Sequence, residues 1–244
     1  MNDPHASAWR CVRTEIIALR DGGGSALDEH HAKTVLDSLG IAVPRGVRVN
    51  GREEIAPRLR DLSAPFALKA LAVAPLHKSD IGAVRLHLPS AASIELARTE
   101  IASRLADSEI NVTGYLVEEM AEPGVELVIG GIIDPQLGPM LMLGAGGIFA
   151  EILDDSAFGL CPISRIDAQR MMRDLKVYPI LAGARGREPV AMDAIVDALI
   201  VLGGPDGFFT HNADLIREFD LNPIFAAPDG IVAVDARVVI GGAR

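Results

Sequence analysis

The hydrophobic pattern of the chain changes near its middle. From Ser25 to about Leu105, stretches with apolar residues at helical spacing alternate with short strand-like apolar runs. After Gly114 the apolar runs are mostly short and end at glycine or proline, which is typical of strands joined by turns. The sequence therefore predicts a mixed α/β chain of the α+β class, with two lobes that meet near Gly114.

The individual elements follow from the same patterns. We expect helices over 25–39, 52–62, 90–105, 167–175 and 191–202, and strands over 66–70, 84–88, 114–120, 125–133, 140–143, 217–222 and 231–239. Residues 122–124 are predicted to close an antiparallel pair, and residues 228–230 to join the last two strands. The predicted domains are a loosely attached leader over 1–24, a small lobe over 25–114 and a C-terminal lobe over 115–244.

Composition excludes several classes of protein. The 244 residues are 49% hydrophobic and 23% charged, as in ordinary globular chains, and the net charge of −10 argues against a nucleic-acid partner. No apolar run reaches the roughly 18 to 20 residues that a membrane span needs. The two cysteines, Cys11 and Cys161, predict neither a disulfide framework nor a zinc site, and they fit a reducing, cytoplasmic location.

The first candidate site follows the strand over 66–70. Lys69 lies at the end of this apolar run and precedes a loop with His77, Lys78, Ser79 and Gly82. Such a lysine is often a surface residue whose stem packs on apolar neighbours. Alternatively, lysine, polar side chains and a glycine that lets backbone amides approach can together bind phosphate oxygens.

The second candidate is the glycine run that follows the strand over 140–143. Gly144, Gly146 and Gly147 lie within eight residues of Glu151. The spacing is not G-x-G-x-x-G and no βαβ unit precedes it, which disfavours a dinucleotide-binding Rossmann site. A β-bulge or a tight turn remains the simple alternative.

The third candidate is a group of acidic residues near the C-terminus. Glu218, Asp220 and Asn222 are spaced by two and therefore share one face of a strand, and Asp235 on the next strand can come level with them. Oxygen ligands of this kind suit Mg²⁺ bound together with nucleotide phosphates. The alternatives are an exposed polar sheet face and, for Asn222, an ordinary turn before Pro223.

Seven motifs in one order give the chain a family resemblance. From about Ser25 to Ile240 it resembles an ATP-grasp domain, and more narrowly the β subunit or domain of NDP-forming acyl-CoA synthetases such as ADP-forming acetate–CoA ligase, relatives of succinyl-CoA ligase. The motifs are Phe66–Lys69, His77–Gly82, Val125–Gly130, Asp134–Pro135 with Gly138–Pro139, Gly144–Glu151, Gly183–Gly186, and Asp220–Pro223 with Val234–Arg237.

The resemblance implies a role for each candidate residue. It implies an ATP-grasp fold with the nucleotide between the two lobes, and catalytic roles for His77 and Lys69. The residues implied in ATP binding are Lys69, Lys78, Ser79, Glu118 and Met120 near the adenine, Glu126 on the ribose, and Gly146, Gly147 and Glu151. Those implied in binding Mg²⁺ are Asn222 and Asp235, with Asp220 beside them.

The resemblance also implies a partner. In the family, ATP phosphorylates a histidine of a CoA-binding α subunit or domain, and the phosphoryl group then activates a carboxylic acid before the thioester with CoA forms. This chain shows no CoA-binding domain, so we expect an acid–CoA ligase (ADP-forming) that is active only with an α subunit, as an α2β2 hetero-oligomer. Two positions depart from the family pattern, Ala83 for glycine and Gly159 for arginine. The alternative function is therefore a catalytically reduced ATP-grasp module that binds or regulates.

Overall fold

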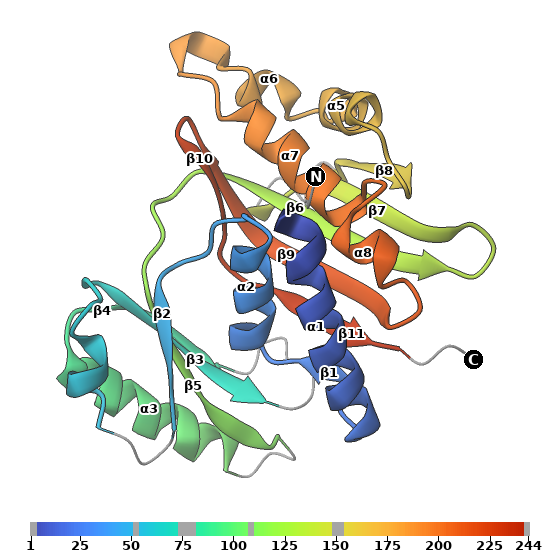
Figure 1. The fold of residues 1–244 in the computed structure, drawn as a ribbon. Coiled ribbons are helices and arrows are strands. Elements are labelled where there is room, and N and C mark those ends of the chain that lie inside the picture. The colour runs from blue at the N-terminus through green and yellow to red at the C-terminus, as the bar shows by residue number, and fades with distance from the viewer. Residues whose placement is uncertain (1–3, 51–53, 73–81, 107–109, 148–153, 242–244) are drawn as a thin grey trace.

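A computed structural model describes residues 4–50, 54–72, 82–106, 110–147 and 154–241 (Figure 1). These residues form two β-sheets, and every strand pair in them is antiparallel. The mixed helix and sheet composition that the sequence predicts is therefore confirmed.

The larger sheet has seven strands. Its main order is β1-β11-β9-β6-β7-β8, and β10 also pairs with β9. The strands are β1 (Ala26–Leu27), β6 (Val125–Asp134), β7 (Gly138–Ala145), β8 (Ser156–Leu160), β9 (Ile216–Ala227), β10 (Gly230–Ala233) and β11 (Arg237–Ile240).

The smaller sheet has four strands in the order β2-β5-β3-β4. They are β2 (Gly46–Val49), β3 (Phe66–Ala72), β4 (Val84–Leu88) and β5 (Val112–Glu119). Helix α3 (Ala91–Leu105) runs along this sheet at the lower left of Figure 1, and its Ile94 and Ile101 belong to a small core with Leu68 and Val117. Ser90 caps α3, so the helix begins one residue later than the predicted range 90–105.

The remaining helices belong to the larger sheet. They are α1 (Pro4–Asp21), α2 (Glu29–Ser38), α5 (Arg165–Asp174), α6 (Tyr178–Leu181), α7 (Met192–Gly203) and α8 (Phe208–His211), and two 3-10 turns lie at Ala56–Leu59 and Ala184–Gly186. Residues of α1, α2, α5 and α7 share one large hydrophobic core with the sheet. The register places its members Ile129, Leu141 and Phe219 on one face of the sheet.

The N-terminal segment differs from the predicted loose leader. It forms α1, whose Val12 and Ile16 are buried in the large core. The Arg13 guanidinium also pairs with Asp214 at 2.6 Å. The reason is that Val12 and Ile16 are four residues apart and lie on one face of the helix.

The predicted hairpin between residues 114–120 and 125–133 is wrong. These strands are β5 and β6, and they belong to different sheets, because β6 pairs with β7 and β9 instead. The residues from Met120 to Gly124 therefore connect the sheets rather than close a hairpin. The predicted lobe boundary at Gly114 lies inside β5, and the chain leaves the small sheet only after Glu119.

Three other elements differ in extent. Helix α2 begins at Glu29 rather than Ser25, because Ala26 and Leu27 pair with β11 as strand β1. The predicted helix over 52–62 is, in its described part, only the short 3-10 turn at Ala56–Leu59. The predicted strand over 231–239 is divided into β10 and β11.

Candidate functional site

Four charged side chains meet in the interior where the two sheets face each other. Lys33 and Glu29 come from α2, Lys69 from β3 and Glu118 from β5, and each is at most 4% exposed. The Lys69 ammonium lies 2.6 Å from Glu29 Oε1 and 3.0 Å from Glu118 Oε2. The Lys33 ammonium lies 2.8 Å from Glu29 Oε1 and 2.6 Å from Glu118 Oε1. We call these four residues the charge quartet.

Strand β1 and helix α2, which were predicted in the small lobe, pack with the large sheet and belong to the large lobe, so the charge quartet connects the two lobes. Its α2 members belong to a helix whose Ala32, Val35 and Leu36 pack in the large core, whereas Lys69 and Glu118 belong to the small sheet. Lys69 also donates a 2.8 Å hydrogen bond to the carbonyl oxygen of Val234, between β10 and β11. Lys69 is thus a buried interlobe cation and not the surface lysine of the alternative interpretation.

The pKa values of the two lysines shift in opposite directions, although the carboxylates favour the charged form of both. Burial alone would lower the pKa of Lys69, but the charges of Glu29, Glu118 and Asp235 raise it above its ordinary value. Burial and the positive charge of Lys69 lower the pKa of Lys33. Lys69 therefore keeps its proton at neutral pH, which a phosphate-binding cation requires.

Two groups of residues predicted to hold the adenosine part, Met120 on one side and Glu126 with its glycines on the other, flank the connection between the sheets. Glu118, also predicted near the adenine, instead pairs with Lys33 and Lys69 in the charge quartet. The Met120 amide donates to the carbonyl oxygen of Pro65 at 3.0 Å, directly after β5. On the other side, the Gly146 amide donates to the carbonyl oxygen of Glu126 at 2.8 Å. Gly147 has φ of +57°, and a Cβ there would lie 2.6 Å from Glu126 Oε2. Glu126, Gly146 and Gly147 thus lie together, and Gly147 leaves room for the carboxylate.

The acidic residues of β9 share one face of the large sheet. Glu218 and Asp220 point away from the core that Phe219 and Leu221 enter. In the strand register, Asp220 of β9 lies opposite Arg237 of β11, and Ile224 of β9 lies opposite Ala233 of β10.

The same register extends to the predicted metal ligands. Counting from both flanking pairs places Asn222 opposite Asp235. Asn222 is exposed and Asp235 is half-buried, and the negative charge of Asp235 reaches the Lys69 ammonium. The sequence prediction that Asp235 comes level with the polar residues of β9 agrees with this register.

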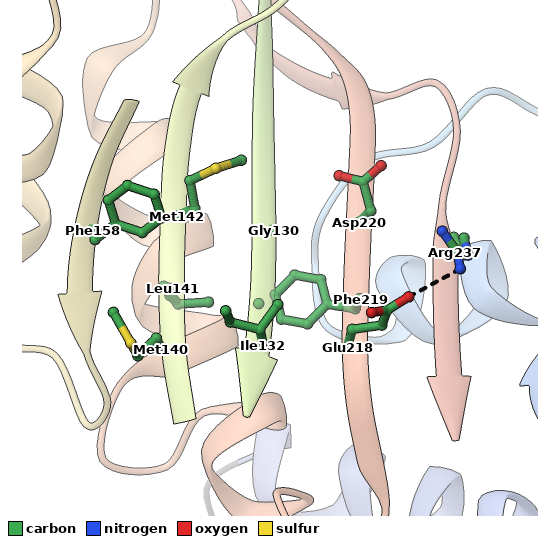
Figure 2. Close-up of a pocket in the computed structure, with 11 residues that line it drawn as sticks. Gly130, Ile132, Met140, Leu141, Met142, Phe158, Glu218, Phe219, Asp220 and Arg237 are labelled. Atoms are coloured by element: carbon green, nitrogen blue, oxygen red, sulfur yellow. Dashed lines mark hydrogen bonds and ion pairs between the residues drawn. The ribbon is translucent and has the colours of Figure 1, made fainter. Parts of the chain in front are cut away.

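A pocket of about 290 Å³ opens on the same face (Figure 2). Met140 and Met142 of β7 and Phe158 of β8 form its apolar side, and Gly130 of β6 lies between this side and β9. On the opposite side, Arg237 of β11 pairs with Glu218 at 2.9 Å. The face thus has an apolar region beside the acidic residues.

The donor set at Asn222 and Asp235 fits Mg²⁺ in part. Amide and carboxylate oxygens are ligands that Mg²⁺ accepts, and this ion usually completes its shell with water and phosphate oxygens. In the described part of the chain, no three His, Cys, Asp or Glu side chains gather closely enough to hold a metal ion. The arrangement therefore suits an ion that is shared with a phosphate ligand.

The structure shows where the two positions that depart from the expected family pattern lie. A Cβ at Gly159 would lie 2.8 Å from Met171 Sδ and 2.9 Å from Ile163 Cγ2, so this position faces α5 on the core side of β8. A side chain there would not point to the face that carries Asp220. Ala83 is fully buried in the small core, and its carbonyl oxygen accepts from the Ala70 amide at 2.9 Å.

Four predicted site residues lie outside the described residues: His77, Lys78, Ser79 and Glu151. Conversely, the structure places Glu29 and Lys33 at the candidate site, although the sequence patterns did not single them out. The sequence did contain one indication of their burial: Glu29 and Lys33 lie on the same face of α2 as the buried Ala32 and Leu36. A Glu–Lys pair on the apolar side of a helix indicates buried partners elsewhere in the fold.

Comparison with known proteins agrees with this geometry. A family model described as an ATP-grasp domain matches residues 18–240. The chain is 38% identical over 224 residues to the "Acetate--CoA ligase [ADP-forming] II subunit beta" of Pyrococcus furiosus, covering 90% of this chain and 94% of that protein.

Two solved structures of acetyl-coenzyme A synthetase 1 from Ca. Korarchaeum cryptofilum are similar as well. Each is 38% identical and covers 94% of this chain and 99% of that chain. One, with coenzyme A and Ca-AMPCP, has a TM-score of 0.85. The other, with coenzyme A and Mg-AMPPCP and a "phosphohistidine segment pointing towards nucleotide binding site", has a TM-score of 0.78. The chain belongs to the ATP-grasp family, with β subunits of ADP-forming acetate–CoA ligases among its homologues.

Proposed function

We propose that this chain is the nucleotide-binding subunit of an ADP-forming acyl-CoA synthetase. It binds ATP with Mg²⁺ between its lobes and phosphorylates a histidine of a CoA-binding partner. The observation that carries this proposal is the position of Lys69, a buried cation at the lobe junction beside Asp235. The similarity to a β subunit and to structures with bound nucleotide analogues supports it.

The chain's own residues divide the work of binding. Lys69 supplies positive charge for the phosphates, and Glu126 beside Gly146 and Gly147 supplies acceptors for ribose hydroxyls. Asn222 and Asp235, with Asp220 beside them, would hold Mg²⁺. Bound Mg²⁺ neutralises charge on the transferring phosphoryl group, and most catalysis of phosphoryl transfer comes from such positioning and electrostatics.

The partner completes the reaction. The related Pyrococcus furiosus protein is named a β subunit. Both structures from Ca. Korarchaeum cryptofilum contain coenzyme A, and one is described with a phosphohistidine segment that points towards the nucleotide binding site. We therefore assign carboxylic acid activation and thioester formation to a separate CoA-binding subunit, in a heterotetramer with two copies of each chain. His77 would relay the phosphoryl group to the partner, and Lys78, Ser79 and Glu151 would complete the nucleotide site.

Reconstitution tests this proposal. The isolated chain should bind Mg-ATP but form little acyl-CoA, and adding the partner should give thioester, ADP and phosphate. Robust thioester formation by the isolated chain would contradict the division of labour. ATP binding with no turnover in the complex would favour the alternative, a regulatory ATP-grasp module.

A further inference from the structure

Lys69 has no free donor left in the charge quartet. An ammonium group has three N–H bonds, and the Lys69 ammonium contacts three oxygens, those of Glu29, Glu118 and Val234. To contact a nucleotide phosphate, Lys69 must therefore give up at least one of these contacts. Its affinity for phosphate then depends on how strongly the two carboxylates hold it.

Lys33 competes with Lys69 for the same two carboxylates. Its ammonium contacts Glu29 Oε1, which Lys69 also contacts, and the second oxygen of Glu118. With two lysines and two glutamates, the charge quartet is formally neutral. A buried carboxylate that loses its cation is costly, so Lys33 is the group that can stay on both glutamates when Lys69 moves away.

We propose that Glu29 and Lys33 are positioning residues that set the phosphate affinity of Lys69. Lys33 keeps both carboxylates neutralised while Lys69 exchanges one carboxylate contact for a phosphate oxygen. Glu29 acts in the opposite direction, because it competes with phosphate for Lys69. This inference rests on the proposed nucleotide site and adds two α2 residues to it.

The proposal predicts opposite effects for two charge-removing variants. Lys33→Met leaves the remaining quartet with a charge of −1, which holds Lys69 and repels phosphate. Glu29→Gln leaves a charge of +1, which releases Lys69 and attracts phosphate. A purely structural role for α2 would instead make both variants weaker binders or leave both unchanged.

Titration calorimetry with Mg-ATP, ADP and adenosine separates these cases. For the full chain we expect ATP and ADP to bind Lys33→Met about tenfold more weakly than wild type and Glu29→Gln several-fold more tightly. Adenosine should bind all forms alike, because it has no phosphate. The double variant Lys33→Met/Glu29→Gln should return towards wild-type affinity for ATP, and Lys33→Arg should stay close to it.

Matched controls remove the same charges elsewhere. Lys176→Met and Glu188→Gln change exposed side chains next to α6 and α7 and should leave ATP affinity unchanged. If Lys33→Met does not fold, the same test compares Glu29→Gln with the double variant Lys33→Met/Glu29→Gln. Glu29→Gln should then bind ATP about tenfold more tightly than the double variant.

Two results would overturn the inference. One is an ATP affinity that shifts in the same direction, or does not shift, in both Lys33→Met and Glu29→Gln. The other is an equal loss of adenosine affinity in Lys33→Met, which would indicate a general distortion of the site. Failure of the wild-type chain to bind ATP would overturn the proposed function itself, and this outcome is read from the wild-type titration alone.

Discussion

The charged and polar residues at the lobe junction differ in how far they are buried. The members of the charge quartet are buried, and their ionisation is tolerated only because each cation touches two carboxylates. Asn222 is exposed, and Asp235 is only half-buried. Changes at this second pair should therefore affect ligand binding more than folding.

Asn222→Ala and Asp235→Ala test this difference. If both residues bind Mg²⁺, each change leaves the ion undercoordinated where charge develops on the phosphoryl group. We expect most of the reconstituted activity to be lost while the melting temperature changes little. Asp229→Ala, at the exposed turn between β9 and β10, is the matched control and should keep full activity. Lost stability with retained turnover would assign the pair a structural role instead.

The sequence predicted the strand register of the acidic residues better than the burial of Lys69. Spacing by two was enough to place Glu218 and Asp220 on one face, and the turn over 228–230 brought Asp235 level with Asn222. The burial of Lys69 could not be predicted, because its counter-ions come from α2 and from another strand. Partners that are distant in sequence are fixed only by the tertiary packing.

At the scale of the elements, helix α2 is held against the small sheet by Asp28 at its N-terminus. Asp28 caps its first turn by accepting from the His31 amide at 2.9 Å, and Arg48 of β2 lies 2.6 Å from the other carboxylate oxygen. Burial alone would raise the pKa of Asp28, but the hydrogen bonds from His31 and the charges of His31 and Arg48 lower it to about 2. Asp28 thus ties a helix of the large lobe to a strand of the small sheet.

Asp28→Ala should destabilise the protein in a pH-dependent way. Loss of the cap costs about 1 kcal/mol, which lowers the melting temperature of a chain of this size by about 2–4 °C. Because the folded pKa is lowered from 3.8 to about 2, the charged form of Asp28 stabilises the fold fully above the unfolded pKa. This contribution is lost as the pH falls from about 4 towards 2.

Thermal melts at pH 6 and at steps down to pH 3 check this expectation. The difference in unfolding free energy between wild type and Asp28→Ala should be largest at pH 6 and shrink below pH 4. Asp37→Ala, at the exposed end of the same helix, should show no such trend. A difference that stays constant or grows on acidification would contradict the role given to the Asp28 carboxylate.

Element prediction failed mainly where the chain changes sheets. Helices α3, α5 and α7 were predicted within a few residues because their apolar spacing is local. The turn-like residues 122–124 were predicted to close a hairpin, yet β5 and β6 belong to different sheets. Strand β1 has only two residues, and its pairing with β11 depends on a contact more than 200 residues away. Local patterns cannot specify such long-range pairing.

At the scale of the whole molecule, two sheets with separate cores meet at a charged junction. The chain connects them through residues 120–124, and α2 connects them through the charge quartet. No helix in the described ranges is long and apolar enough to cross a membrane. The face of the large sheet that points away from the large core carries a pocket with Asp220 at one side (Figure 2).

Transfer of the γ-phosphoryl group is the most direct test of the proposed function. With γ-labelled Mg-ATP, the chain should label a histidine of its CoA-binding partner, and the partner should stay unlabelled when that histidine is replaced. His77→Ala should abolish this labelling with little change in ATP binding, because imidazole is a competent nucleophile near its reference pKa of about 6.5. His77→Asn should not restore labelling. An unlabelled partner beside an ATP-bound wild-type chain would contradict the account, and near-normal labelling by His77→Ala would contradict the relay through this residue.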